Sequence, residues 1–185
     1  MGRKHLTGFT LLELLVTLAI LSVVLFISMA SFIDLIRANQ LATQVNFFIA
    51  ATNLARNEAI TRSQRVFICA RAGNVCSGAS SWENGWIVFS DEDGDSVVSK
   101  GEVMRYFEAL QPGYVLRPNI GTTHLIYYGD GHVRRNGGML PLVTFRLCAP
   151  DAAPGAIAER VREVVIGAAG RVRLQPGREG KTICP

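Results

Sequence analysis

The feature that most constrains the fold is a long uncharged stretch near the N-terminus of this 185-residue chain. The 20 residues from Leu14 to Ile33 contain no charged side chain, and as a helix they would span about 30 Å. That length matches the hydrocarbon core of a bilayer, so the stretch predicts a membrane-spanning helix. Arg3 and Lys4 precede it, which predicts that the N-terminus stays in the cytoplasm.

Three interpretations of this stretch compete. A cleaved secretory signal would find small residues for cleavage at Ser28-Met29-Ala30, but its apolar core would exceed the roughly 7–15 residues that are usual. A plain membrane anchor leaves Glu13 unexplained, because a carboxylate at the start of a span is costly and calls for a partner. The third interpretation accounts for Glu13 and rests on a short motif.

The residues Gly8-Phe9-Thr10-Leu11-Leu12-Glu13 resemble the class III signal of type IV pilins and pseudopilins. In that family a prepilin peptidase removes the leader, here residues 1–8, by cleaving after the glycine, here Gly8. It then methylates the new terminal amine, here on Phe9. The resemblance also implies that Glu13 pairs with the terminal amine of a neighbouring filament subunit. A buried carboxylate and ammonium are costly alone and much less so as a pair.

The helix is predicted to continue beyond the membrane, so that residues 9–62 form one element with its transmembrane part at about 9–33. Past the span, apolar and small side chains recur at steps of three and four residues, which places them on one helical face. That face is expected to pack on a globular domain. It consists of Leu41, Val45, Phe48, Thr52, Ala55 and Ala59.

Residues 63–185 are predicted to form a β-rich globular domain in the periplasm. Short runs of β-forming residues alternate there with turn residues, and the segment is long enough to enclose one core when a helix packs on it. The predicted fold class is therefore α+β: a long N-terminal helix on an antiparallel, β-rich domain, as in pilins. The expected strands are Arg65–Ala70, Gly85–Ser90, Glu102–Leu110, Thr123–Tyr128, Leu142–Cys148, Arg160–Ile166 and Arg171–Leu174.

The chain has four cysteines, and the predicted topology places all of them outside the cytoplasm, where disulfides persist. Four cysteines allow three pairings. We favour Cys69 with Cys76, which closes a short loop, and Cys148 with Cys184, which ties the C-terminal end to a strand. A zinc site is the alternative, but no C-x-x-C unit is present and no bound metal is expected.

An acidic segment has the spacing of an EF-hand calcium loop, with Asp91, Asp93, Asp95 and Glu102 at positions 1, 3, 5 and 12. However, an EF-hand requires glycine at position 6, where this chain has Ser96, and the flanking segments are predicted strands. We favour a solvated acidic loop, and calcium binding is the alternative.

Signals for catalysis are weak. The sequence has no G-x-S-x-G, no H-E-x-x-H and no phosphate-binding glycine loop. With only His5, His124 and His132, a three-histidine metal site would need all of them, including one near the N-terminus. The sequence therefore predicts a protein that is not an enzyme and that has no cofactor.

The C-terminal part of the chain is basic, with ten Lys and Arg against five Asp and Glu in residues 112–185. Arg171 and Arg173 alternate with Val172 and Leu174, so a strand would bury the apolar pair and present both guanidiniums on its other face. Two residues of strand separate them by about 6.6 Å, of the order of the spacing between neighbouring phosphates. Arginine suits phosphate because its planar fork donates two hydrogen bonds.

Together these features resemble the GspH/FimT family over nearly the whole chain. The resemblance rests on the N-terminal motif, on Gly85-Trp86-Ile87-Val88-Phe89 before the acidic loop, and on Gly170-Arg171-Val172-Arg173 before the last cysteine. In FimT-like members that take part in natural transformation, a G-R-x-R motif contacts DNA. The resemblance thus implies a DNA site at Gly170, Arg171 and Arg173, and the alternative is a hairpin with solvated arginines.

The sequence as a whole predicts a minor pilin or pseudopilin that is inserted in the inner membrane and then joins a type IV pilus or a type II secretion pseudopilus. Its expected partners are other pilins, the prepilin peptidase, the inner membrane and DNA. The alternative from another class is a membrane-anchored or secreted enzyme, for which the sequence offers neither a nucleophile nor a base.

Overall fold

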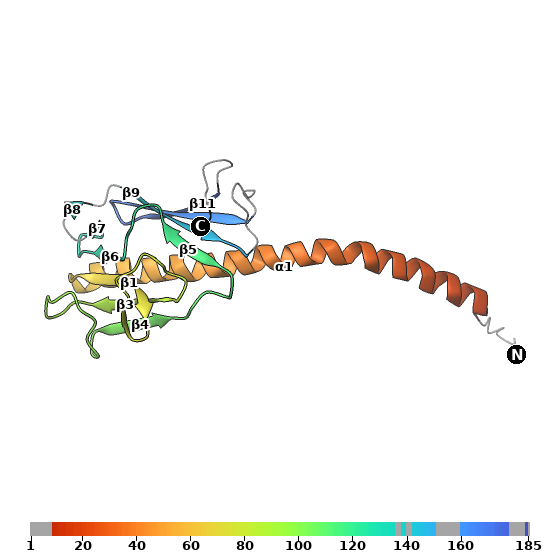
Figure 1. The fold of residues 1–185 in the computed structure, drawn as a ribbon, viewed down its shortest axis with the longest axis horizontal. Coiled ribbons are helices and arrows are strands. Elements are labelled where there is room, and N and C mark those ends of the chain that lie inside the picture. The colour runs from red at the N-terminus through yellow and green to blue at the C-terminus, as the bar shows by residue number, and fades with distance from the viewer. Residues whose placement is uncertain (1–8, 136–137, 140–141, 151–159, 178–183, 185) are drawn as a thin grey trace, which may run out of the picture. The chain divides into compact units, whose positions relative to one another are not determined.

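The computed structural model describes the chain apart from residues 1–8, 136–137, 140–141, 151–159, 178–183 and 185. The chain divides into two compact units, Met1–Asn39 and Gln40–Pro185. One long helix, α1 (Leu11–Arg62), is followed by a β-rich region (Figure 1). The first part of α1 belongs to the first unit, and residues 40–62 belong to the second.

Local chemistry explains both ends of α1. At its start, the backbone N–H of Glu13 donates a hydrogen bond to the Thr10 hydroxyl oxygen at 3.2 Å, which caps the helix. At its end, Ser63 adopts a left-handed φ of 53°, and the N–H of Gln64 donates to the carbonyl of Ala59 at 3.3 Å. A left-handed residue of this kind commonly terminates a helix.

The first unit presents apolar side chains to its surroundings. Every large hydrophobic side chain from Phe9 to Phe26 is exposed. Among the residues that the structure describes, no helical stretch combines the length and the hydropathy needed to cross a membrane.

The second unit buries one face of α1. All six side chains that the sequence places on this face are at most 1% exposed. The predicted face is therefore confirmed, and Ala51 lies buried beside it.

Two antiparallel sheets complete the second unit (Figure 1). In the seven-stranded sheet the order is β4-β3-β1-β6-β7-β8, and β2 pairs with β1. In the four-stranded sheet the order is β11-β10-β9-β5, so β11 and β5 form its edges. The strands of the larger sheet are β1 (Val66–Ala72), β2 (Val75–Cys76), β3 (Trp86–Ser90), β4 (Val103–Phe107), β6 (His124–Tyr127), β7 (Val133–Arg135) and β8 (Gly138–Met139). Those of the smaller sheet are β5 (Val115–Pro118), β9 (Leu142–Cys148), β10 (Val161–Gly167) and β11 (Val172–Pro176).

Phe48 of α1 lies where the helix meets both sheets. Its ring packs edge-on against Trp86 of β3, with centroids 5.3 Å apart, and is tilted against Phe145 of β9 at 4.6 Å. Trp82 packs edge-on against the same ring at 5.8 Å, and its indole N–H donates to the carbonyl of Thr122 at 3.0 Å. The helix and the two sheets therefore share one core.

The observed strands follow the predicted ones with shifts at their ends. Leu142–Cys148 is reproduced as β9, whereas the predicted strand Glu102–Leu110 is shorter, at Val103–Phe107. Strand β5 has no clear signal in the sequence, because Val115–Pro118 is short and ends in a proline. Proline is tolerated there because β5 is an edge strand.

Candidate nucleic-acid interface

The β10–β11 hairpin carries Gly170, Arg171 and Arg173. Its two strands pair in antiparallel register, with Val165 opposite Arg173 and Ile166 opposite Val172. The turn is closed by two backbone hydrogen bonds, from Gly170 N–H to the Gly167 carbonyl at 2.8 Å and from Gly167 N–H to the Arg171 carbonyl at 3.2 Å. The hairpin therefore holds the strand that bears both arginines in a defined register.

Arg173 lies on β11, and Arg171 is the residue directly before the strand. Val172 between them is half-buried and packs against the core, so the alternation of a strand directs Arg171 and Arg173 to the opposite face, where both are exposed. The prediction that Leu174 is buried is wrong, because this side chain is 44% exposed. Among the described strands, β11 is at the edge of its sheet and has β10 as its one neighbour.

The described carboxylates leave both arginines without an ion pair. Among the described residues, neither Arg171 nor Arg173 forms an ion pair with a carboxylate. The acidic side chain on β10, Glu163, is buried and accepts hydrogen bonds from Arg146 Nε at 3.1 Å and from Gln175 Nε2 at 2.9 Å. Its negative charge is therefore matched by Arg146.

Gly170 is buried and has a left-handed φ of 69°. A Cβ atom at this position would stand 2.2 Å from the carbonyl oxygen of Gly131, in the turn between β6 and β7. It would also stand 3.1 Å from Arg56 Nε and from the Tyr127 ring. The space and the backbone conformation thus both require glycine here.

Polar groups around the β6–β7 turn have altered proton affinities. Burial raises the pKa of the Tyr127 hydroxyl well above its ordinary value, and the charge of Arg56 partly offsets this rise. The backbone N–H of His132, which donates to Asp130 Oδ1 at 2.9 Å, is the main cause that lowers the pKa of Asp130. Arg134 donates to the other oxygen of Asp130 at 3.0 Å. At neutral pH the turn therefore holds a neutral tyrosine and an ionised aspartate.

The residues predicted for processing and filament assembly lie in the first unit. Gly8 is outside the described residues, while Phe9 is exposed just before α1. Glu13 is exposed in the first turn of the helix. Its pairing with the amine of a neighbouring subunit stays a prediction.

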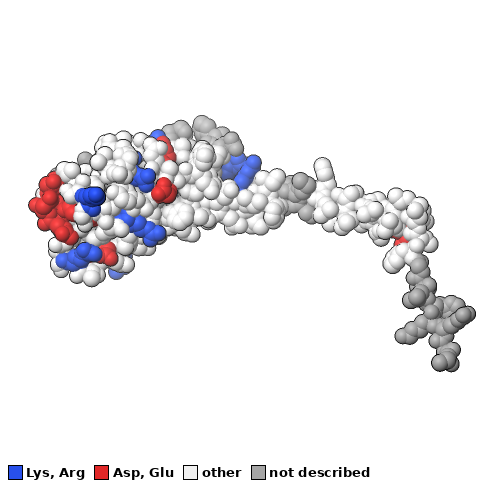
Figure 2. All heavy atoms as spheres, turned by 90° about the horizontal axis from the view of Figure 1, so that it is seen from below, with Lys and Arg blue, Asp and Glu red and all other residues white. Residues whose placement is uncertain are grey.

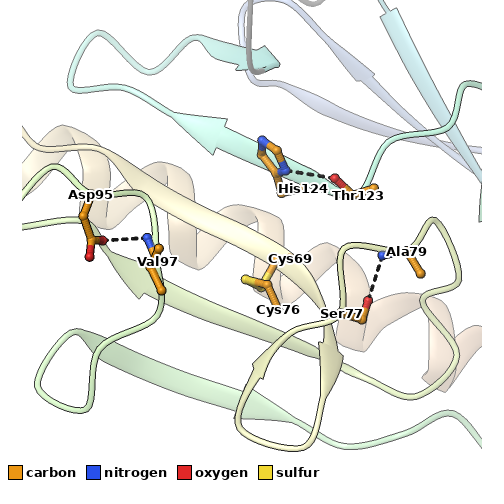
Figure 3. Close-up of a disulfide and its surroundings, with 8 residues drawn as sticks. All are labelled: Cys69, Cys76, Ser77, Ala79, Asp95, Val97, Thr123 and His124. Carbon is orange, nitrogen blue, oxygen red and sulfur yellow. Dashed lines mark hydrogen bonds between the residues drawn. A yellow bond between two sulfur atoms is a disulfide. The ribbon is translucent and has the colours of Figure 1, made fainter.

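The structure joins Cys69 to Cys76 and Cys148 to Cys184, the pairing that the sequence analysis favours. The first disulfide links β1 to β2 beside His124, whose ring Nδ1 is 3.0 Å from the Thr123 hydroxyl (Figure 3). The second joins the end of β9 to the C-terminal segment after β11. Both therefore fasten short or terminal segments to a sheet.

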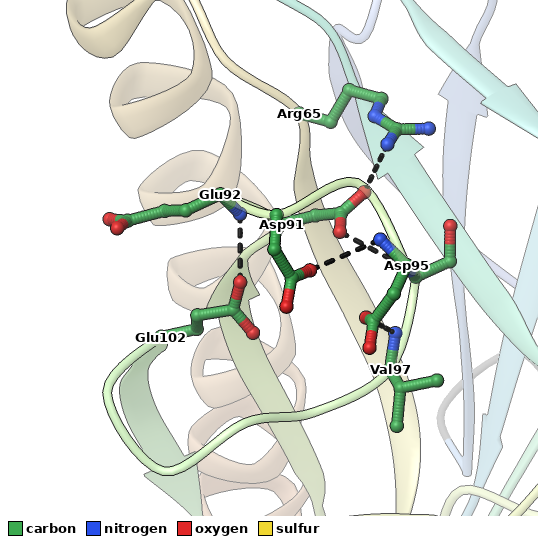
Figure 4. A network of polar contacts seen from close by, with 8 residues as sticks. Arg65, Asp91, Glu92, Asp95, Val97 and Glu102 are labelled. Carbon is green, nitrogen blue, oxygen red and sulfur yellow. Dashed lines mark hydrogen bonds and ion pairs between the residues drawn. The ribbon is translucent and has the colours of Figure 1, made fainter.

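The acidic loop between β3 and β4 is held by hydrogen bonds within the protein (Figure 4). The buried Asp91 pairs with Arg65 at 2.5 Å and accepts the Ser96 N–H at 3.0 Å. The carboxylate of Glu102 accepts the N–H groups of Glu92 at 2.8 Å and Ser99 at 3.2 Å. Carboxylate oxygens of Asp91, Asp93 and Asp95 lie within 4.8 Å of one another. Calcium binding stays the alternative to a loop held by these contacts alone.

Acidic and basic side chains are distributed differently over the second unit. Figure 2 shows the largest group of acidic side chains at the end where the loop after β3 lies, while basic side chains and a few further acidic ones are spread over the rest of that face. The acidic loop and the β10–β11 hairpin belong to different sheets. A polyanion would therefore be repelled by one part of this unit and attracted by another.

Sequence reasoning missed Arg56, Tyr127 and Gly131 as neighbours of Gly170. Arg56 falls off the apolar stripe of the helix, where a solvated side chain is the default interpretation. Gly131 indicates a turn, but the sequence does not indicate which segment packs on that turn. These contacts arise from tertiary packing, and Arg56 is more than 100 residues from Gly170 in the sequence. No local sequence signal could therefore have revealed them.

Most of the chain matches a known protein family. Residues 44–170 match a family model described as type II transport protein GspH, and residues 3–29 match the prokaryotic N-terminal methylation motif. The GspH match ends at Gly170, so Arg171 and Arg173 lie just beyond it. None of the curated proteins matches the sequence.

Solved structures show the same fold. A crystal structure of the type IV minor pilin FimU from Pseudomonas aeruginosa is similar with a TM-score of 0.55 and 20% identity, over 75% of this chain and 90% of that one. A second crystal form of FimU gives a TM-score of 0.51 and 18% identity, over 76% and 90%. The predicted α+β fold, a long helix packed on antiparallel sheets, is confirmed.

Proposed function

Since the chain belongs to the GspH family of type II transport proteins, we propose that it is built into a filament as a minor subunit and binds DNA there. Members of this family are pseudopilins, which are structural proteins and not enzymes. The alternative of an anchored or secreted enzyme is therefore set aside. The filament is that of a type IV pilus or of a type II secretion system.

The route to the filament begins in the inner membrane. The methylation motif over residues 3–29 supports cleavage by a prepilin peptidase after Gly8 and methylation of Phe9. The uncharged run from Leu14 to Ile33 and the exposed apolar side chains of the first unit support insertion at about residues 9–33, with the second unit in the periplasm. The same apolar surface can later contact other subunits, with Glu13 opposite a terminal amine.

Intact mass and N-terminal sequencing of protein extracted from membranes test this route. We expect a chain that begins at a methylated Phe9, and we expect Gly8→Leu to block cleavage because the peptidase cleft requires a small residue. A mature chain beginning at Ser31 would mean that residues 1–30 are a secretory signal, and the filament proposal would be rejected.

DNA binding is proposed for the solvent face of β11. The observation that carries it is the pair Arg171, directly before β11, and Arg173, on β11, which are both exposed and which form no ion pair among the described residues. Such groups contact phosphates, which give affinity without sequence preference. With few contacts, the dissociation constant is expected to be micromolar or weaker at physiological salt.

Gel-shift titrations of the full chain in a non-ionic detergent, at several salt concentrations, test this site. Arg171→Gln with Arg173→Gln should lose most of the binding, and the slope of log affinity against log salt should shrink by about 1.8, which is two contacts on duplex DNA. A matched control, Lys100→Gln with Arg105→Gln, removes the same charge from β4 and the loop before it, and should bind like wild type. Equal binding by both double variants would exclude β11 as the DNA site.

A further inference from the structure

Two hairpins from different sheets meet at Gly170. The backbone N–H of Val133 on β7 donates to the carbonyl of Ala168 in the β10–β11 turn at 2.9 Å. Next to this bond, Gly170 packs so closely on the carbonyl of Gly131 that no side chain fits between them. The turn that precedes Arg171 therefore rests on the turn between β6 and β7.

Helix α1 supports this junction through Arg56. Its Nε donates a hydrogen bond to the carbonyl of Gly131 at 3.2 Å, and its side chain is half-buried. This is the same carbonyl oxygen that faces Gly170. A terminal nitrogen of Arg56 also lies 3.2 Å from the position that a Cβ on Gly131 would occupy, so the guanidinium lies along the β6–β7 turn.

The junction acts on a strand that has little other support. Within the part of the chain that the structure describes, β11 pairs with β10 alone, and its first residue, Val172, is only half-buried. The contacts at the turn therefore add to the pairing with β10 and to the packing of Val172 in holding the beginning of β11. A loose turn would let Arg171 and Arg173 sample many orientations, and binding would then have to order them at an entropic cost.

We propose that Arg56 is a positioning residue for DNA binding: by holding the Gly131 carbonyl against Gly170, it fixes the turn from which Arg171 and Arg173 project. The inference rests on the DNA binding proposed above. In this role Arg56 does not contact DNA itself. It also explains the glycine of the Gly170–Arg173 segment by packing inside the protein, and not by close approach of the backbone to a phosphate.

The test compares Arg56→Met and Arg56→Lys in the full chain, with DNA binding measured well below the melting temperature of each variant. Methionine keeps the stem but cannot donate, so we expect affinity to fall about fivefold, the factor carried by one typical intramolecular hydrogen bond. Lysine can donate from Nζ and should restore most of the affinity. Because Arg56 does not touch DNA, the salt slope should stay at its wild-type value in both variants.

A second pair of variants tests the junction from its other side. Gly170→Ala places a methyl group on the Gly131 carbonyl and should weaken DNA binding at least as much as Arg56→Met. Gly167→Ala, in the same turn, meets no atom within 4 Å and should bind like wild type. If Gly170→Ala does not fold, the Arg56 pair decides the question alone.

The outcomes separate this inference from the proposed function. If the Arg171 and Arg173 double variant loses binding while Arg56→Met binds like wild type, the positioning role is wrong and the DNA site stands. A salt slope reduced by about 0.9 in Arg56→Met would make Arg56 a phosphate contact and would also overturn the inference. If the double variant binds normally, the DNA site itself is rejected, and the positioning role with it.

Discussion

Replacing Phe48 by alanine should destabilise the second unit more than any other single truncation on α1. Phe48 is 1% exposed and packs against aromatic rings at 4.6, 5.3 and 5.8 Å, which belong to β9, to β3 and to the segment before β3. Phe→Ala in a core costs about 3–5 kcal/mol in the free energy of unfolding. Rigid aromatic neighbours cannot collapse into the space, so we expect about 4 kcal/mol or more.

The neighbouring residue supplies the control. Phe47 is the same residue type on the same helix but is 50% exposed, so Phe47→Ala should change the free energy of unfolding by no more than about 0.5 kcal/mol. For a unit of 146 residues, Gln40–Pro185, a loss of about 4 kcal/mol lowers the melting temperature by about 8–16 °C. Thermal unfolding followed by near-ultraviolet circular dichroism reports it. Equal shifts in the two variants would refute the assignment of Phe48 to a shared core.

Three further predictions concern other parts of the chain. Glu13→Val should leave membrane insertion intact or improved, because a charge leaves the apolar segment, but should lower incorporation into filaments, as immunoblots of sheared filaments would show. Asp91→Asn should lower the free energy of unfolding in urea by about 2–3 kcal/mol. This is less than the roughly 3–5 kcal/mol for breaking a fully buried pair, because the Arg65 side chain is 36% exposed. The control is Asp93→Asn, at an exposed position. Loss of the Cys148–Cys184 disulfide should cost about 4 kcal/mol and loss of Cys69–Cys76 about 2.5 kcal/mol, because the first closes a longer loop.

The elements that could be predicted are those with a strong local signal. The stripe from Leu41 to Ala59 shows the helical period, and its side chains are buried where that period places them. Leu142–Cys148 alternates in the manner of a strand and is one, as β9. Local periodicity was sufficient in both cases because each element buries its own face.

Other features depended on partners that are distant in sequence. The exposure of Leu174 follows from the position of β11 at a sheet edge, which the alternation of β11 does not encode. The positions of Arg171 and Arg173 on one face could be predicted from alternation alone. The packing of Gly170 on Gly131 could not, because 39 residues and a change of sheet separate the two glycines.

The close approach of Gly170 to Gly131 restricts which residues of this hairpin can be substituted during evolution. As long as the Gly131 carbonyl stands there, any mutation at position 170 adds atoms where there is no room, whether or not the protein meets DNA. Positions 171 and 173 are under no such restriction from the fold. If the proposed DNA binding is correct, a lineage that lost it should therefore keep the glycine while the two arginines are replaced. Retention of the arginines, and not of the glycine, would then distinguish the lineages that bind DNA.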